Sequence, residues 1–167
     1  GFQSYMLEKV YQKECAEPNQ VVLDFTGDIN LCEDWPTTEH MDEQSNGIED
    51  CMSQALLTEM RSADILMINN EYTYSTGGKP LAGKTYTFRA NPRRVSVLGT
   101  LGTDIVSVAN NHVYDYGPAA LVDTLETLEQ AGMPYVGAGR NLEEAMQPVS
   151  FIANGRKITI VAATQIE

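Results

Sequence analysis

The residues best suited to chemistry come directly after three apolar segments of the chain. These polar groups are Gly27-Asp28, Asn69-Asn70-Glu71 and Asn110-Asn111-His112. Carboxylate and amide oxygens, together with an imidazole nitrogen, are ligands for Mn, Mg, Fe or Zn in proteins. Because a metal-bound water can act as a nucleophile at neutral pH, these residue types indicate metal-assisted hydrolysis.

Each polar group follows a short apolar run that is typical of a buried strand. The three runs are Val21–Thr26, Ala63–Ile68 and Ile105–Ala109. In open α/β folds the carboxyl ends of parallel strands meet at one edge of the sheet, and ligands bind there. The sequence therefore predicts that Asp28, Glu71 and His112 lie together at one rim.

The same residue types also have structural explanations. Asp and Asn commonly end strands because they bond to their own backbone and tolerate left-handed conformations. A turn or capping role explains Asp28 as well as metal binding does, and a structural histidine bonded to a neighbouring loop is the alternative for His112. Glu71 follows a six-residue buried strand, which favours a functional role. We expect Asp115 and Tyr116 to brace the turn that presents His112.

Helical patterns and turns separate the strands, so the sequence predicts an α/β fold with a largely parallel sheet. Helices are expected at 48–62, 92–101, 118–131 and 142–146, and short extended segments at 85–89 and 135–137. Asn154-Gly155 predicts a hairpin. Residues 29–47 are expected to form a long loop. Residues 1–20 are expected to be a leader or short helix, and residues 21–167 one domain.

Composition limits the class of protein. A hydrophobic content of 43% over 167 residues is enough for one domain with a core. The formal charge of −12 argues against nucleic acid or an anionic membrane surface as a partner. The cysteines, Cys15, Cys32 and Cys51, lack C-x-x-C spacing, although one disulfide would be possible.

No apolar run is long enough for a membrane span, and no signal peptide is evident. The chain ends just after the apolar run 158–163, so we expect the natural protein to continue beyond Glu167. A sheet truncated there would leave an open edge near 157–163, through which two copies could associate.

Five sequence blocks follow the order seen in one protein family. They are Phe25 to Asp28, Ala63 to Ile65 with Asn69 to Glu71, Phe88 to Pro92, Ser107 to His112 with Asp115 to Gly117, and Val136 to Asn141 with Glu144-Ala145. The blocks resemble the bacterial capsule-synthesis proteins of the poly-γ-glutamate type (CapA/PgsA), which look like relatives of calcineurin-type metallophosphoesterases. The resemblance covers roughly residue 21 to the C-terminus.

This resemblance implies the N-terminal portion of a metallophosphoesterase-like layered α/β sandwich. It also implies a role at the extracellular face of the bacterial membrane in making or exporting poly-γ-glutamate, with the anchor outside this sequence. By the family pattern, Asp28, Glu71 and Asn111 would bind a divalent metal (Mn, Zn, Fe or Mg). His112 would be the catalytic histidine that steadies the scissile phosphate. The residues that would support the metal ligands or contact the substrate are Asn69, Asn110 and Arg89.

Two functions follow as hypotheses. In the first, the rim acts on a phosphoester or related bond. In the second, the protein is a non-catalytic subunit that binds the anionic polymer or membrane-bound synthase subunits. Arg89, Arg93 and Arg94 could supply a local basic patch for such a polymer, although an arginine pair in the first turns of a helix is more often a solvated face. The aspartate-x-histidine of ordinary phosphoesterases is absent, and the chain has only two histidines, His40 and His112.

Overall fold

The structure, a computed structural model, describes residues 8–165. Four parallel strands form its main sheet, in the order β2-β3-β6-β7. Their bounds are Leu23–Ile29 (β2), Ile65–Asn70 (β3), Ile105–Ser107 (β6) and Tyr135–Val136 (β7). The predicted α/β class with a largely parallel sheet is confirmed.

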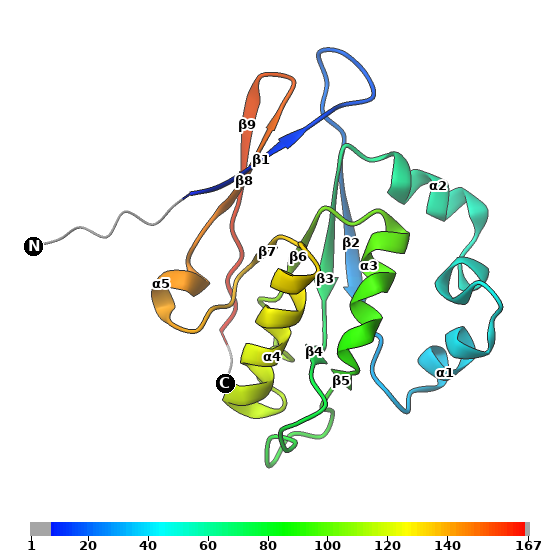
Figure 1. Cartoon of the computed structure of the whole chain (residues 1–167), viewed down its shortest axis with the longest axis vertical. Helices are drawn as coiled ribbons and strands as arrows, with labels where there is room; N and C mark the ends of the chain where they lie inside the picture. The colour runs from blue at the N-terminus through cyan, green and yellow to red at the C-terminus, as the bar shows by residue number, and fades with distance from the viewer. Residues whose placement is uncertain (1–7, 166–167) are drawn as a thin grey trace, which may run out of the picture.

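A second sheet packs against one face of the main sheet (Figure 1). It contains β1 (Lys9–Lys13), β8 (Val149–Ala153) and β9 (Arg156–Ile160), where β8 lies between a parallel β1 and an antiparallel β9. Asn154-Gly155 turns the β8–β9 hairpin as predicted, with both residues at positive φ. Apolar side chains from both sheets, among them Ile65, Ile105 and Phe151, fill the space between them.

Helices cover the opposite face of the main sheet, so the molecule has three layers (Figure 1). Their bounds are Pro36–Glu43 (α1), Gln54–Ser62 (α2), Ser96–Leu101 (α3) and Gly117–Gln130 (α4), with 3₁₀ helices at Gly47–Cys51 (η1) and Pro92–Val95 (η2). The short helix α5 (Leu142–Ala145) buries no side chain and lies apart from this layer, next to the second sheet (Figure 1). The larger apolar core lies under the helical layer and includes Leu66, Leu98 and Leu125, none of which reaches the solvent. Among residues 8–165 no helix combines the length and apolar character that crossing a bilayer requires.

Local sequence signals explain where several helices begin and end. The Asn91 side chain accepts a hydrogen bond from Arg93 N and so caps η2, and Asn141 caps α5 by accepting from Glu144 N. Gly102 and Gly132, with φ of 81° and 66°, follow α3 and α4 in the left-handed conformation that glycine adopts without strain.

Three expectations need correction. Lys9–Lys13 is a strand, not part of a leader or short helix, because β8 offers it a free edge to pair with; residues 1–7 of that expectation lie outside the described residues. The expected long loop at 29–47 contains α1, which starts at Pro36. The expected helix at 48–62 is broken at Met52 into η1 and α2, and the Ser53 side chain caps α2.

The prediction that Arg93 and Arg94 form a solvated face is wrong for Arg94, whose side chain is only 5% exposed. Its guanidinium donates two hydrogen bonds to each of two carboxylates, Glu33 and Asp42. These contacts join η2 to α1, which explains why the residue is buried. All three cysteines, at 15, 32 and 51, are free.

A two-stranded parallel ladder completes the framework around the rim. β4 (Thr73–Tyr74) pairs with β5 (Arg89–Ala90), so the loop between them leaves one strand of the ladder and returns to the neighbouring strand. This loop, residues 75–88, includes the segment that reaches the carboxyl ends of β3 and β6.

Candidate functional site

The predicted rim exists, and its first contact joins β2 to β3. Asp28 and Asn69 are register partners in the parallel ladder, after a bulge in β2 between Phe25 and Asp28. The Asn69 Nδ2 donates to Asp28 Oδ1 at 2.6 Å. The Asp28 side chain is exposed, so its second carboxylate oxygen can be presented to a ligand.

Asn110 links the end of β3 to the turn that carries His112. Its Nδ2 donates to Asn69 Oδ1 at 3.1 Å and to Asn70 O at 3.0 Å, while its Oδ1 accepts from His112 N at 3.0 Å. Asn110 is buried, so these bonds satisfy both ends of its amide without water. These contacts place Asn69 and Asn110 beside Asp28 and His112, and their role in supporting metal ligands or substrate stays a prediction.

The His112 imidazole is held from two sides. Its Nδ1 donates to Asp115 Oδ2 at 2.7 Å, and the ring of Phe88 lies 4.2 Å from its own, centroid to centroid. Because an ionised carboxylate only accepts hydrogen bonds, Nδ1 is the donor in this contact, and Nε2 is the ring nitrogen that faces the rim. The expectation that Asp115 braces the His112 turn is confirmed.

Nε2 of His112 faces Glu71 Oε1 at 3.8 Å. That separation is too long for a direct hydrogen bond, but it leaves the two groups able to bind a shared water or substrate oxygen. Burial and the neighbouring charge of Asp28 raise the pKa of Glu71, and this rise is opposed by His112. A carboxyl with a raised pKa next to an oriented imidazole is the arrangement that general acid–base chemistry uses.

Lys84 forms an ion pair with the carboxylate of Asp115, the residue that orients His112. The Asp115 side chain is fully buried, and the Lys84 Nζ lies 2.5 Å from its Oδ1 and also donates to the backbone oxygen of Asn111. Phe88 N donates a further bond to Asp115 Oδ2 at 2.7 Å. The 75–88 loop thereby supplies both a cation and an amide to the carboxylate that orients His112.

The donor set at the rim suits a hard divalent cation better than a soft one. Asp28 and Glu71 contribute carboxylates close enough for one charge to raise the pKa of the other, a strain that a bound cation would relieve. Within residues 8–165 no group of three or more His, Cys, Asp or Glu could hold a metal ion. A cation at the rim would therefore need the Asn111 amide oxygen, and water, to complete its coordination.

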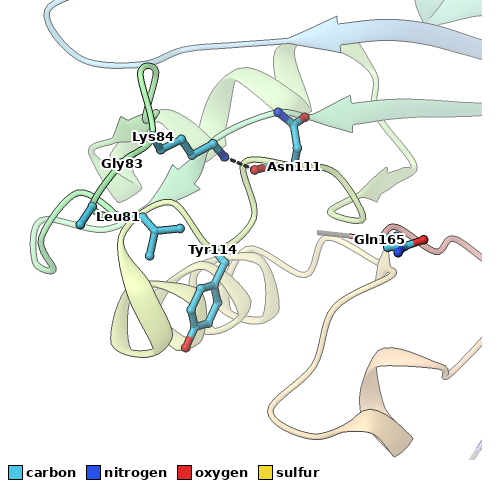
Figure 2. A pocket seen from close by; sticks show the side chains of 7 residues that line it. Leu81, Gly83, Lys84, Asn111, Tyr114 and Gln165 are labelled. Atoms are coloured by element: carbon cyan, nitrogen blue, oxygen red, sulfur yellow. Dashed lines mark hydrogen bonds between the residues drawn. The ribbon is translucent and has the colours of Figure 1, made fainter. Parts of the chain in front are cut away.

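The structure places the remaining predicted residues on either side of this rim. The exposed Asn111 turns its amide away from Lys84, leaving it available to a ligand (Figure 2). Arg89 is engaged elsewhere, because its guanidinium lies 4.4 Å from the Tyr116 ring centroid and donates to Gly77 O. These contacts hold the base of the 75–88 loop.

Lys84 and Phe88 are the site residues that sequence reasoning missed. A single lysine in a polar loop carries no pattern that separates it from a solvated one. The available clue was the expectation that Asp115 braces the His112 turn, since a carboxylate that becomes buried in such a role needs a cationic partner.

Comparison with protein families matches residues 22–167 to the family described as bacterial capsule synthesis protein PGA_cap. The chain belongs to this family. The match includes the rim residues from Asp28 to Asp115 described above.

Three relatives illustrate the similarity. The PGA biosynthesis protein CapA of Bacillus subtilis is 30% identical over 85% of this chain and 37% of its own length. A probable polyglutamine synthesis accessory protein of Mycobacterium tuberculosis is 31% identical over 65% of this chain and 29% of its own. The capsule biosynthesis protein CapA of Bacillus anthracis is 30% identical over 50% and 20%. The chain thus aligns with less than two-fifths of each relative.

Proposed function

We propose that this protein takes part in the synthesis of a bacterial capsule polymer of the poly-γ-glutamate type, and that its rim acts on a phosphoester or related bond. Family membership and the names of the relatives support the first part. One observation carries the second: a buried Asp115 orients His112 so that its Nε2 faces Glu71.

Within this proposal His112 holds or moves a proton at Nε2. Asp115 keeps the imidazole in the tautomer that leaves Nε2 open, and it stabilises the positive charge that forms when Nε2 takes a proton. Phe88 and the loop around Lys84 keep bulk water from the Nδ1 side. Glu71, whose pKa is raised, can exchange a proton with a water or substrate oxygen that lies between it and His112.

Asp28, Glu71 and Asn111 are the residues that would hold a divalent cation in this proposal. When bound, such an ion supplies Lewis-acid polarisation and lowers the pKa of a coordinated water. The chain has a formal charge of −12, which repels anions. A bound cation would supply the positive charge that attracts the anionic phosphoester substrate. We further propose that the protein works at the extracellular face of the membrane, beside membrane-bound synthase subunits.

A second candidate function is supported by the small number of strong ligands at the rim. With no three His, Cys, Asp or Glu positioned for a metal in the part of the chain that the structure describes, the same side chains could serve a subunit that binds polymer without reacting with it. The two candidates differ in one property, the dependence of turnover on His112.

Hydrolysis of a chromogenic phosphodiester, bis(p-nitrophenyl) phosphate, with Mn²⁺ present separates them. If His112 is the acid–base group, His112→Ala lowers kcat by about 10²-fold or more. The matched control is His40→Ala, which removes the exposed histidine of α1 and is expected to retain the full rate. Equal rates for wild type and His112→Ala, or a wild-type rate no higher than buffer, would favour the binding subunit.

A further inference from the structure

A cavity of about 520 Å³ opens beside the rim (Figure 2). It is lined by residues 81–84, Asn111, Tyr114 and Gln165. Its volume lies within the range of small-molecule sites. The Lys84 side chain reaches across it to the backbone oxygen of Asn111, so the cavity and the His112 turn share a wall.

The charge of the lining contrasts with that of the whole chain. Among the described residues that line the cavity, Lys84 alone carries a charged side chain, whereas the chain has 23 acidic and 11 basic residues. Asp115, the carboxylate that pairs with Lys84, is fully buried and does not line the cavity, so the ammonium is the charged group that the cavity presents to an approaching anion.

Lys84 has capacity for one more acceptor. An ammonium has three N–H donors, and Lys84 directs two toward Asp115 and the Asn111 carbonyl. Its side chain is 25% exposed, so the third N–H can reach the cavity. A carboxylate that accepts it would form a charge-assisted hydrogen bond, the stronger class of such bonds.

We propose that this cavity is a subsite for one glutamyl unit of the polymer, with the side-chain carboxylate of that unit on Lys84. The identity of the polymer rests on the proposed role in poly-γ-glutamate synthesis. A γ-linked glutamyl unit combines a carboxylate, two methylenes and a main-chain amide. Leu81, Ala82 and the ring of Tyr114 line the cavity and offer apolar contact to the methylenes.

The subsite explains how polymer and rim would be aligned. Asn111 lines the cavity and is also a predicted rim ligand, and Lys84 contacts the carboxylate that orients His112. A unit seated on Lys84 would therefore place the next part of the chain next to Nε2 and Glu71. The same contact selects for charge, since a carboxamide in place of the carboxylate offers only a neutral acceptor.

Calorimetric titration of a γ-linked glutamate pentamer, in EDTA to remove bridging cations, tests the proposal. Lys84→Met is expected to weaken binding about 10- to 100-fold, as loss of one charge-assisted bond predicts, and Lys84→Arg to restore most of it. Lys79→Met, which removes an exposed lysine of the same loop outside the cavity, is expected to bind as wild type does. The γ-linked glutamine pentamer should bind at least tenfold more weakly than the glutamate pentamer.

Ala82→Trp provides a test that leaves the Lys84–Asp115 pair in place, because it fills the cavity from an exposed loop position. It too is expected to weaken binding at least tenfold, with an unchanged thermal unfolding curve. Wild-type affinity in both Lys84→Met and Ala82→Trp, equal affinity for the two pentamers, or no binding by wild type would each overturn the subsite. The proposed hydrolysis fails separately, through an unchanged rate in His112→Ala.

Discussion

Replacement of Asp115 by alanine should be the most destabilising single change at the rim. The carboxylate is fully buried and receives bonds from Lys84, from His112 Nδ1 and from Phe88 N. Asp115→Ala leaves all three donors without this acceptor, and all three donor residues are buried or half-buried. Removing one partner of a buried ion pair costs about 3–5 kcal/mol. Total stabilities of domains are about 5–15 kcal/mol, so the loss would be a large fraction of the whole.

Urea denaturation followed by circular dichroism measures this loss. We expect the midpoint to fall with little change in slope, which would indicate lost stability rather than a changed denatured state. Glu126→Ala, on the exposed face of α4, is the matched control and should stay within about 0.5 kcal/mol of wild type.

A double-mutant cycle identifies the origin of the effect. Asp115→Ala combined with Lys84→Met should cost less than the sum of the two single changes, because neither charge is then left without its partner. A cost below about 1 kcal/mol for Asp115→Ala, or strict additivity in the cycle, would refute the claim that this ion pair organises the rim.

Three further predictions concern the framework. Arg94→Met should lower the free energy of unfolding by about 2 kcal/mol at neutral pH. Arg94 lowers the pKa of both carboxyls that it binds, so its contribution is complete above their ordinary pKa values of 4.5 and 3.8 and is lost as the pH falls through the lowered values. The unfolding free energies of the variant and wild type should therefore converge in acid, and a gap that stays constant with pH would contradict this linkage. Gly137→Ala should destabilise the protein by at least about 1 kcal/mol in thermal unfolding, because φ is +94° and the new Cβ would meet the Ala109 Cβ at 2.3 Å beside the β6–β7 pairing. The control Gly99→Ala, in an open part of α3, should be neutral or stabilising. Similar effects of both changes would be inconsistent with this close approach. In the described residues β9 pairs on one side only, so we predict that two copies associate through its free edge. Val161→Lys, at a position that is 68% exposed, should weaken this association. Light scattering that shows a monomer at all concentrations would count against the prediction.

The main sheet could be predicted from sequence because its strands are apolar runs with polar ends. Ile105 to Ser107 and Tyr135-Val136 occur where the pattern placed strands, and the caps at Asn91, Gly102 and Asn141 follow from local chemistry alone. Such features depend on a few neighbouring residues, and this is why the sequence pattern was sufficient.

Features that depend on distant partners were harder to predict. Lys9–Lys13 becomes a strand because β8, about 140 residues later in the chain, pairs with it. Arg94 is buried because two carboxylates on or before α1 surround its guanidinium. Lys84 joins the site because the 75–88 loop returns over the His112 turn, and no local pattern records that return. The position of the rim residues was predictable, since they lie at or just beyond the carboxyl ends of β2, β3 and β6.

Calorimetric titration of Mn²⁺ into the chain is the most direct test of the central claim that the rim is a cation-assisted acid–base site. Wild type should show saturable binding at one site per chain, and an Asp28→Ala/Asn111→Ala double variant should lose it while keeping the same unfolding midpoint. Equal binding by the double variant, or no binding by wild type, would contradict the proposed site.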